Sequence, residues 1–85
     1  MRELLDELKR KIVVELELSD IRPEDIADDA VFFQGGLGLV SVDLLFLISV
    51  LERDYGVLID NRELGEKVFV NLTVLAEYIA QNRRQ

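Results

Sequence analysis

Apolar residues recur at three- and four-residue spacings near the start of the chain, with charged residues between them. This spacing places one apolar stripe on a helix and predicts an amphipathic helix over residues 3–16. Residues 14–18 also alternate apolar and acidic side chains, which is typical of a short strand. We favour the helix because the pattern runs on without a break. The stripe consists of Leu4, Leu5, Leu8, Ile12, Val13 and Leu16.

Residues 41–55 give the clearest helical pattern, and Gly56 is a natural stop after it. The segment is unusually apolar on all sides, so we expect some of the residues outside its core stripe to be partly exposed: Val42, Leu45, Phe46 and Ser49. The expected core stripe consists of Leu44, Leu47, Ile48, Leu51 and Tyr55.

Two further helical segments are expected towards the end of the chain. Residues 60–67 support one short helical turn around Leu64, bounded by Gly65. A last helix begins near Asn71, a good N-cap residue, and runs into a polar, basic tail. Its core positions are Leu72, Leu75 and Ile79.

Residues 19–38 carry turn-forming residues and predict a connection of roughly 20 residues. Loops of that length are uncommon unless they are functional or anchored to a core. Five apolar side chains are the expected anchors: Ile21, Ile26, Val31, Phe32 and Phe33.

Composition limits the possible functions. At 85 residues and 49% hydrophobic content, the chain suits one compact domain over residues 1–85. It has no cysteine and no histidine, which removes disulfides, thiolate chemistry and the commonest general base and zinc ligand. The net charge of −7 argues against nucleic acid. No apolar run spans a bilayer and no signal-peptide pattern is visible, so we expect a cytoplasmic monomer.

The glycine-rich and acidic stretches do not match known catalytic or metal motifs. The run over residues 36–41 has serine where a dinucleotide fingerprint needs its third glycine, and no lysine completes a phosphate-binding loop. The acids of residues 24–29 lack the spacing and glycine of a calcium loop. We therefore assign no catalytic residue and no metal site.

Ser41 has two interpretations. A serine at the start of a helix is commonly an N-cap, although Leu44 stands where a capping box has glutamate or glutamine. Alternatively, its hydroxyl lies beside unpaired backbone N–H groups at the positive end of the helix dipole. Such a site would stabilise a phosphate attached to the serine.

The residues around Ser41 resemble a known family. The stretch Gly-Gly-Leu-Gly-Leu-Val-Ser-Val-Asp-Leu-Leu, residues 35–45, resembles the Gly-Leu-Asp-Ser-Ile/Leu-Asp signature of acyl carrier proteins. Residues 51–57, Leu-Glu-Arg-Asp-Tyr-Gly-Val, resemble the family's Leu-Glu-Glu-Glu-Phe-Gly-Val at the family's distance from the serine. Residues 21–26 and 72–79 are similar to its first loop and closing helix.

This resemblance implies an all-α four-helix bundle with a long first loop and a short third helix. It implies that Ser41 carries covalent 4'-phosphopantetheine, which holds acyl groups as thioesters for fatty-acid, lipid or related biosynthesis, with no catalysis by the domain itself. The implied partners are a phosphopantetheinyl transferase and acyl-transferring or acyl-processing enzymes. The residues expected to dock partners are Val40, Val42, Asp43, Leu45, Phe46 and Glu52.

Two positions depart from the family pattern. The aspartate that usually precedes the serine, where the transferase reads it, is Val40, and the common glutamate five residues after the serine is Phe46. An aminoacyl or polyketide carrier remains an alternative. So does an unmodified, carrier-like module that binds partners through its apolar second helix.

Overall fold

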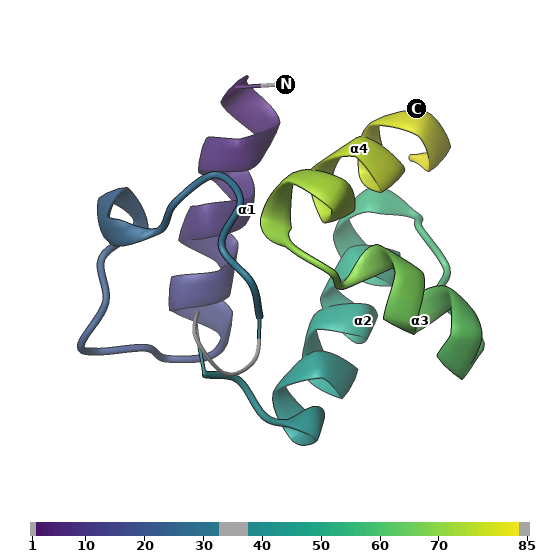
Figure 1. The fold of residues 1–85 in the computed structure, drawn as a ribbon, viewed down its shortest axis with the longest axis horizontal. Helices are drawn as coiled ribbons and strands as arrows, with labels where there is room; N and C mark the ends of the chain where they lie inside the picture. The colour runs from purple at the N-terminus through teal and green to yellow at the C-terminus, as the bar shows by residue number, and fades with distance from the viewer. Residues whose placement is uncertain (1, 33–37, 84–85) are drawn as a thin grey trace.

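The computed structural model describes residues 2–32 and 38–83, and within these residues the chain is all-helical. The described residues form four α-helices, which are labelled in Figure 1: α1 (Arg2–Glu15), α2 (Ser41–Tyr55), α3 (Arg62–Val68) and α4 (Leu72–Asn82). A short 3-10 turn, η1 (Pro23–Asp25), lies in the first connection. The expectation of a helical bundle with a long first loop and a short third helix is confirmed at this level.

The first helix ends one residue earlier than expected, and no strand follows within the described part of the chain. Glu17 has φ 52°, in the left-handed region, which a non-glycine residue rarely adopts. This conformation lets the Leu18 N–H reach back to the Val13 carbonyl at 3.0 Å. The alternation over residues 14–18 therefore belongs to a helix C-terminus that turns the chain away, and not to a strand.

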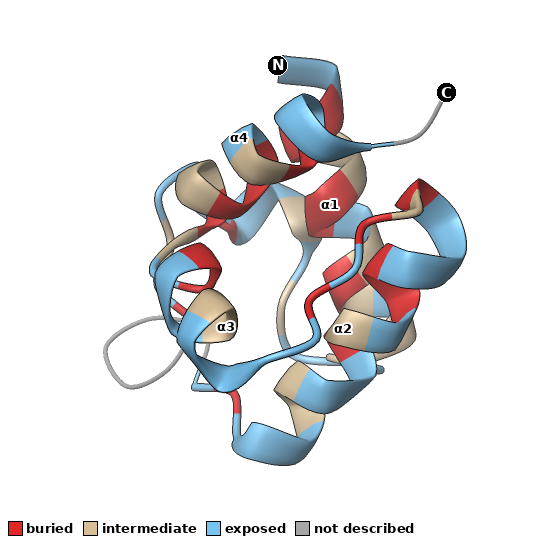
Figure 2. Ribbon diagram, turned by 90° about the vertical axis from the view of Figure 1, so that its right-hand side faces the viewer, coloured by how far each residue is buried: buried red, intermediate tan, exposed pale blue. Residues whose placement is uncertain are grey.

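One cluster of buried side chains joins the four helices (Figure 2). From α1 it takes Leu4, Leu5, Leu8 and Ile12, and from α4 it takes Leu72, Leu75, Ala76 and Ile79. Helix α2 buries Leu47, Val50, Leu51 and Tyr55, while Leu44 and Ile48 of the expected stripe are only partly buried. Val50 is buried although it lies outside that stripe, so α2 is covered over a wider arc than expected.

The long connection is fastened to the rest of the molecule at several points. Ile26 and Phe32 are buried as expected, and the Phe32 ring meets Phe69 edge-on with centroids 5.4 Å apart. The Ala30 carbonyl accepts a hydrogen bond from the Leu72 N–H at 2.9 Å. Val31 was expected to be an anchor, but it is exposed. Phe33 lies outside the described residues.

The short helix α3 differs from expectation in the place of its glycine. Asn61 caps it, with Oδ1 accepting from the Leu64 N–H at 2.7 Å. Gly65 lies inside the helix, because its N–H donates to the Asn61 carbonyl and its own carbonyl accepts from the Phe69 N–H. It therefore does not bound the helix. The predicted cap of α4 is confirmed, since Asn71 Oδ1 accepts from the Val74 N–H at 2.9 Å.

The start of α2 lies at the opposite end of the molecule from the start of α1 and the end of α4 (Figures 1 and 2). The first turn of α2 therefore points away from both ends of the described chain. None of the described helices combines the length and the apolar character needed to cross a membrane.

Candidate functional site

Helix α2 begins at Ser41, and its N-cap is Val40, which has an extended backbone. The interpretation of Ser41 as the N-cap is therefore wrong by one residue. The valine side chain has no acceptor, and Asp43 supplies one by taking a hydrogen bond from the Val40 N–H at 3.1 Å. This is one half of a capping box. It was missed because the acidic partner was sought at position 44.

The Ser41 side chain is exposed in the first turn of a 15-residue helix. Backbone N–H groups in that turn have no partner within the helix, and the helix dipole adds partial positive charge there. A phosphate ester on the Ser41 oxygen would lie beside these donors. The Asp43 carboxylate accepts from the N–H of Val40, the N-cap just before this turn, and its charge opposes a phosphate.

An open pocket of about 890 Å³ lies between α2 and α3, and Ser41 is one of its lining residues. Its walls are mainly apolar and come from both helices and from the segments next to α3: Leu44, Leu45, Ile48, Ile59, Phe69 and Val70. Gly65 of α3 also lines it. The polar lining residues are Asp60, Asn61, Arg62 and Glu66.

Five of the six expected docking residues lie close to Ser41 at the start of α2, and the sixth, Glu52, lies further along the helix. Val40, Val42 and Leu45 are 60%, 72% and 65% exposed. Phe46 is 42% exposed and Asp43 is half-buried, so the first two turns of α2 present a largely apolar surface around Ser41. We call Val42, Leu45 and Phe46 the apolar patch. Glu52 is exposed but lies about 9 Å further along the helix axis than Phe46.

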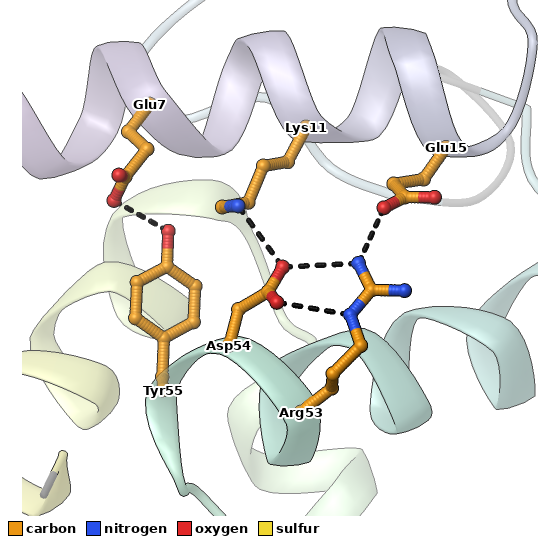
Figure 3. A network of polar contacts seen from close by, with 6 residues as sticks. All are labelled: Glu7, Lys11, Glu15, Arg53, Asp54 and Tyr55. Atoms are coloured by element: carbon orange, nitrogen blue, oxygen red, sulfur yellow. Dashed lines mark hydrogen bonds and ion pairs between the residues drawn. The ribbon is translucent and has the colours of Figure 1, made fainter.

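The C-terminal end of α2 is held to α1 by polar contacts that the sequence analysis missed (Figure 3). The Tyr55 hydroxyl donates to Glu7 at 2.6 Å, and Lys11 Nζ lies 3.0 Å from Asp54 Oδ2. Arg53 contacts both Asp54 and Glu15. Hydrogen bonds from Arg53 and then Lys11 lower the pKa of Asp54, and burial followed by the bond to Glu7 raises the pKa of Tyr55.

A second polar cluster fastens the long connection to α1. Lys9 is buried, and its Nζ lies 2.6 Å from Asp28 Oδ1. Arg2 contacts the same carboxylate. Hydrogen bonds from Arg2 and then Lys9 lower the pKa of Asp28 to about 2. The Asp28 carbonyl also accepts from the Thr73 hydroxyl at 2.8 Å, so this residue links the loop to α1 and α4.

The pocket was the main feature that sequence reasoning did not assemble. Its α3 wall contains Gly65, and an interior glycine in a helical pattern was a signal available in the sequence. Comparison with protein-family models finds no match, and comparison with curated proteins finds none either. The functional interpretation therefore depends on the residues and their arrangement.

Proposed function

We propose that the protein is a carrier that holds an acyl group as a thioester on 4'-phosphopantetheine attached to Ser41. The sequence around Ser41 resembles the attachment signature of acyl carrier proteins. The bound arm would supply the thiol that this cysteine-free chain lacks. The chain's own part is to present the serine and to shelter the cargo.

The observation that carries the proposal is the position of the Ser41 side chain. It is exposed at the start of α2, where a transferase has access, and it also lines the apolar pocket between α2 and α3. A group tethered at this serine therefore has an apolar enclosure within reach. A serine with only a structural role in the first turn of α2 has no need of that pocket.

Partner enzymes would approach the apolar patch and Val40. Ordinary exposed apolar residues are scattered, whereas these lie together within the first two turns of α2, next to the serine. Aromatic side chains at such contacts often contribute 2 kcal/mol or more to binding. We infer that Phe46 is the anchor of a docking surface, with the half-buried Asp43 at its edge and Glu52 outside it.

Modification of Ser41 is tested by incubating the protein with coenzyme A and a broad-specificity phosphopantetheinyl transferase and measuring intact mass. The wild-type chain should gain one phosphopantetheine and Ser41→Ala should gain none. Ser49→Ala is the matched control, because Ser49 is exposed on the same helix and should not affect modification. Modification of Ser41→Ala, or an unmodified wild type under prolonged reaction, would reject the assignment.

The docking surface is tested in the same assay through Phe46→Glu. This change adds the charge common in the family, and we expect faster modification by a broad-specificity transferase. Ser49→Glu places the same charge on the same helix outside the apolar patch and should have less effect. Equal rates for both variants would contradict a docking role for Phe46, and circular dichroism checks that the fold is intact.

The exposed apolar patch also favours a second candidate function, a carrier-like module that binds a partner without modification. The two candidates differ in what happens to Ser41. Under the second, Ser41→Ala leaves partner binding unchanged and Phe46→Glu abolishes it. A protein-binding module also has no need of a reactive hydroxyl at the pocket.

A further inference from the structure

Gly65 occupies a position where neither the backbone nor the packing requires glycine. It lies in the interior of α3 with regular helical hydrogen bonds, donating to the Asn61 carbonyl at 3.1 Å and accepting from the Phe69 N–H at 2.9 Å. Among the described glycines, positive φ is found at Gly38 and Gly56 and not at Gly65. Glycine is, after proline, the least favourable residue in a helix interior.

A larger side chain at this position has room next to the backbone. A Cβ built on Gly65 would meet one atom within 4 Å, Ile59 Cγ2 at 3.9 Å, which is ordinary van der Waals contact. Ile59 and Gly65 both line the pocket between α2 and α3. The space left open by the missing side chain is therefore pocket space.

The polar lining residues of the pocket, Asp60, Asn61, Arg62 and Glu66, are all exposed, and some of them contact one another or the backbone. Arg62 Nε lies 3.2 Å from Glu66 Oε1. Asn61 Oδ1 caps α3, and its Nδ2 donates to Asp60 at 3.3 Å. These exposed polar groups can stay in contact with water while a hydrocarbon chain packs against the apolar residues that make up most of the lining. The lining therefore fits a hydrocarbon chain better than the polar side chain of an aminoacyl cargo.

We infer that Gly65 sets the capacity of the pocket for a hydrocarbon chain tethered at Ser41. Glycine lowers the stability of this seven-residue helix, but any larger side chain at this position would narrow the pocket opposite Ile59. The inference rests on the proposed function, since the arm on Ser41 would bring the chain to the pocket. It adds the chemical class of the cargo and the residue that limits its size.

The absence of cysteine provides a test that does not depend on the transferase. In a Ser41→Cys background, the single thiol reacts with alkyl methanethiosulfonates. A disulfide forms to the alkylthio group and methanesulfinate leaves. Butyl, octyl and dodecyl reagents then give a series of tethered chains, and the melting temperature is measured before and after each attachment.

With Gly65 present, the melting temperature should rise further as the attached chain lengthens, because more methylene groups are buried. Gly65→Leu should stop this rise at a shorter chain. Lys67→Leu is the matched control, since it adds the same side chain to α3 at an exposed position that does not line the pocket. It should retain the full dependence on length.

Gly65→Ala provides a second test in case Gly65→Leu does not fold. Without an attached chain, Gly65→Ala should melt roughly 4 to 8 °C higher, because alanine is the better helix former and its Cβ fits. It should also reduce the gain from the dodecyl chain. A lower melting temperature for the unloaded Gly65→Ala would overturn the inference, because the fold would then require the glycine.

The inference is also overturned if the melting temperatures of Gly65→Leu and Lys67→Leu depend on chain length in the same way. It is overturned as well if the melting temperature of the protein that keeps Gly65 does not depend on chain length. These outcomes are separate from those of the proposed function, which is scored by transferase modification of Ser41. A length-dependent gain together with an unmodifiable Ser41 would retain the pocket assignment and reject the carrier. If Ser41 is modified but the melting temperature does not depend on chain length, the carrier is retained and the pocket assignment is rejected.

Discussion

The two ends of α2 are built differently. At the C-terminal end, Tyr55 is 5% exposed, and polar contacts from Arg53, Asp54 and Tyr55 join α2 to α1 (Figure 3). At the N-terminal end, Phe46 is 42% exposed, and the hydrogen bond from Val40 to Asp43 is local to the helix. One helix therefore has a fastened end and an accessible end.

The two ends of α2 are therefore expected to serve different purposes, one in stabilising the fold and the other at the candidate site. Side chains at the C-terminal end of α2 contact α1, so we expect substitutions there to change the stability of the fold. Side chains at the accessible end surround Ser41 and face solvent or the open pocket. Under the proposed function the site would have to admit a transferase, an arm and several enzymes, and a rigid helix whose exposed end makes few contacts with the rest of the protein suits that role.

The largest expected effect comes from exchanging the aromatic residue at each end for alanine. Tyr55→Ala should lower the free energy of unfolding by roughly 3 to 5 kcal/mol, because it leaves a cavity and removes the hydroxyl from Glu7. Phe46→Ala should change it by no more than about 1 kcal/mol. Urea unfolding followed by circular dichroism measures both. Equal losses would show that the two ends do not differ.

A smaller effect is expected at the N-cap. Val40→Asp introduces a side chain that can accept a hydrogen bond from the Asp43 N–H and complete the capping box. Stability should rise by about 1 kcal/mol, and under the proposed function a transferase should modify Ser41 faster, because acyl carrier proteins usually have aspartate before the modified serine. Val42→Asp is the control, since it adds the same charge beside Ser41 at a position that cannot cap. A faster rate in both variants would point to charge alone.

The smallest effect concerns the loop contact at Asp28 and depends on pH. Its pKa is lowered to about 2 in the folded protein, against about 3.9 in an unfolded chain. Its contribution to stability is therefore complete above about pH 4 and is lost as the pH falls towards 2. Asp28→Asn should be less stable than wild type at pH 7, and the difference should shrink over that window. A constant difference in urea titrations between pH 7 and pH 2 would contradict this account.

Sequence patterns predicted features that local spacing determines. The bounds of α2, the Asn71 cap and the loop anchors Ile26 and Phe32 all follow from periodicity and turn chemistry. The N-cap of α2 was misplaced because it depends on which acid reaches back to the backbone. Val31 and Gly65 were misjudged because their roles depend on which element lies opposite them.

The polar contacts between α1 and α2 were beyond prediction for a different reason. Glu7 and Tyr55 are 48 residues apart, and Arg53 and Glu15 are 38 apart. Neither pairing leaves a local pattern, because nothing in the sequence near one residue identifies a partner so far along the chain. The pocket was not predicted for a similar reason. Its walls come from α2, α3 and the segments next to α3, and the sequence of one element does not show how it packs against another.

The proposed function requires that Ser41 carries an acyl group on a phosphopantetheine arm. Intact mass measurement of the protein purified from its native cells tests it most directly, before and after treatment with neutral hydroxylamine, which cleaves thioesters. If Ser41 carries the loaded arm, we expect a species heavier than the chain by phosphopantetheine plus an acyl group, which hydroxylamine converts to chain plus phosphopantetheine. Recovery of only the unmodified chain would contradict it.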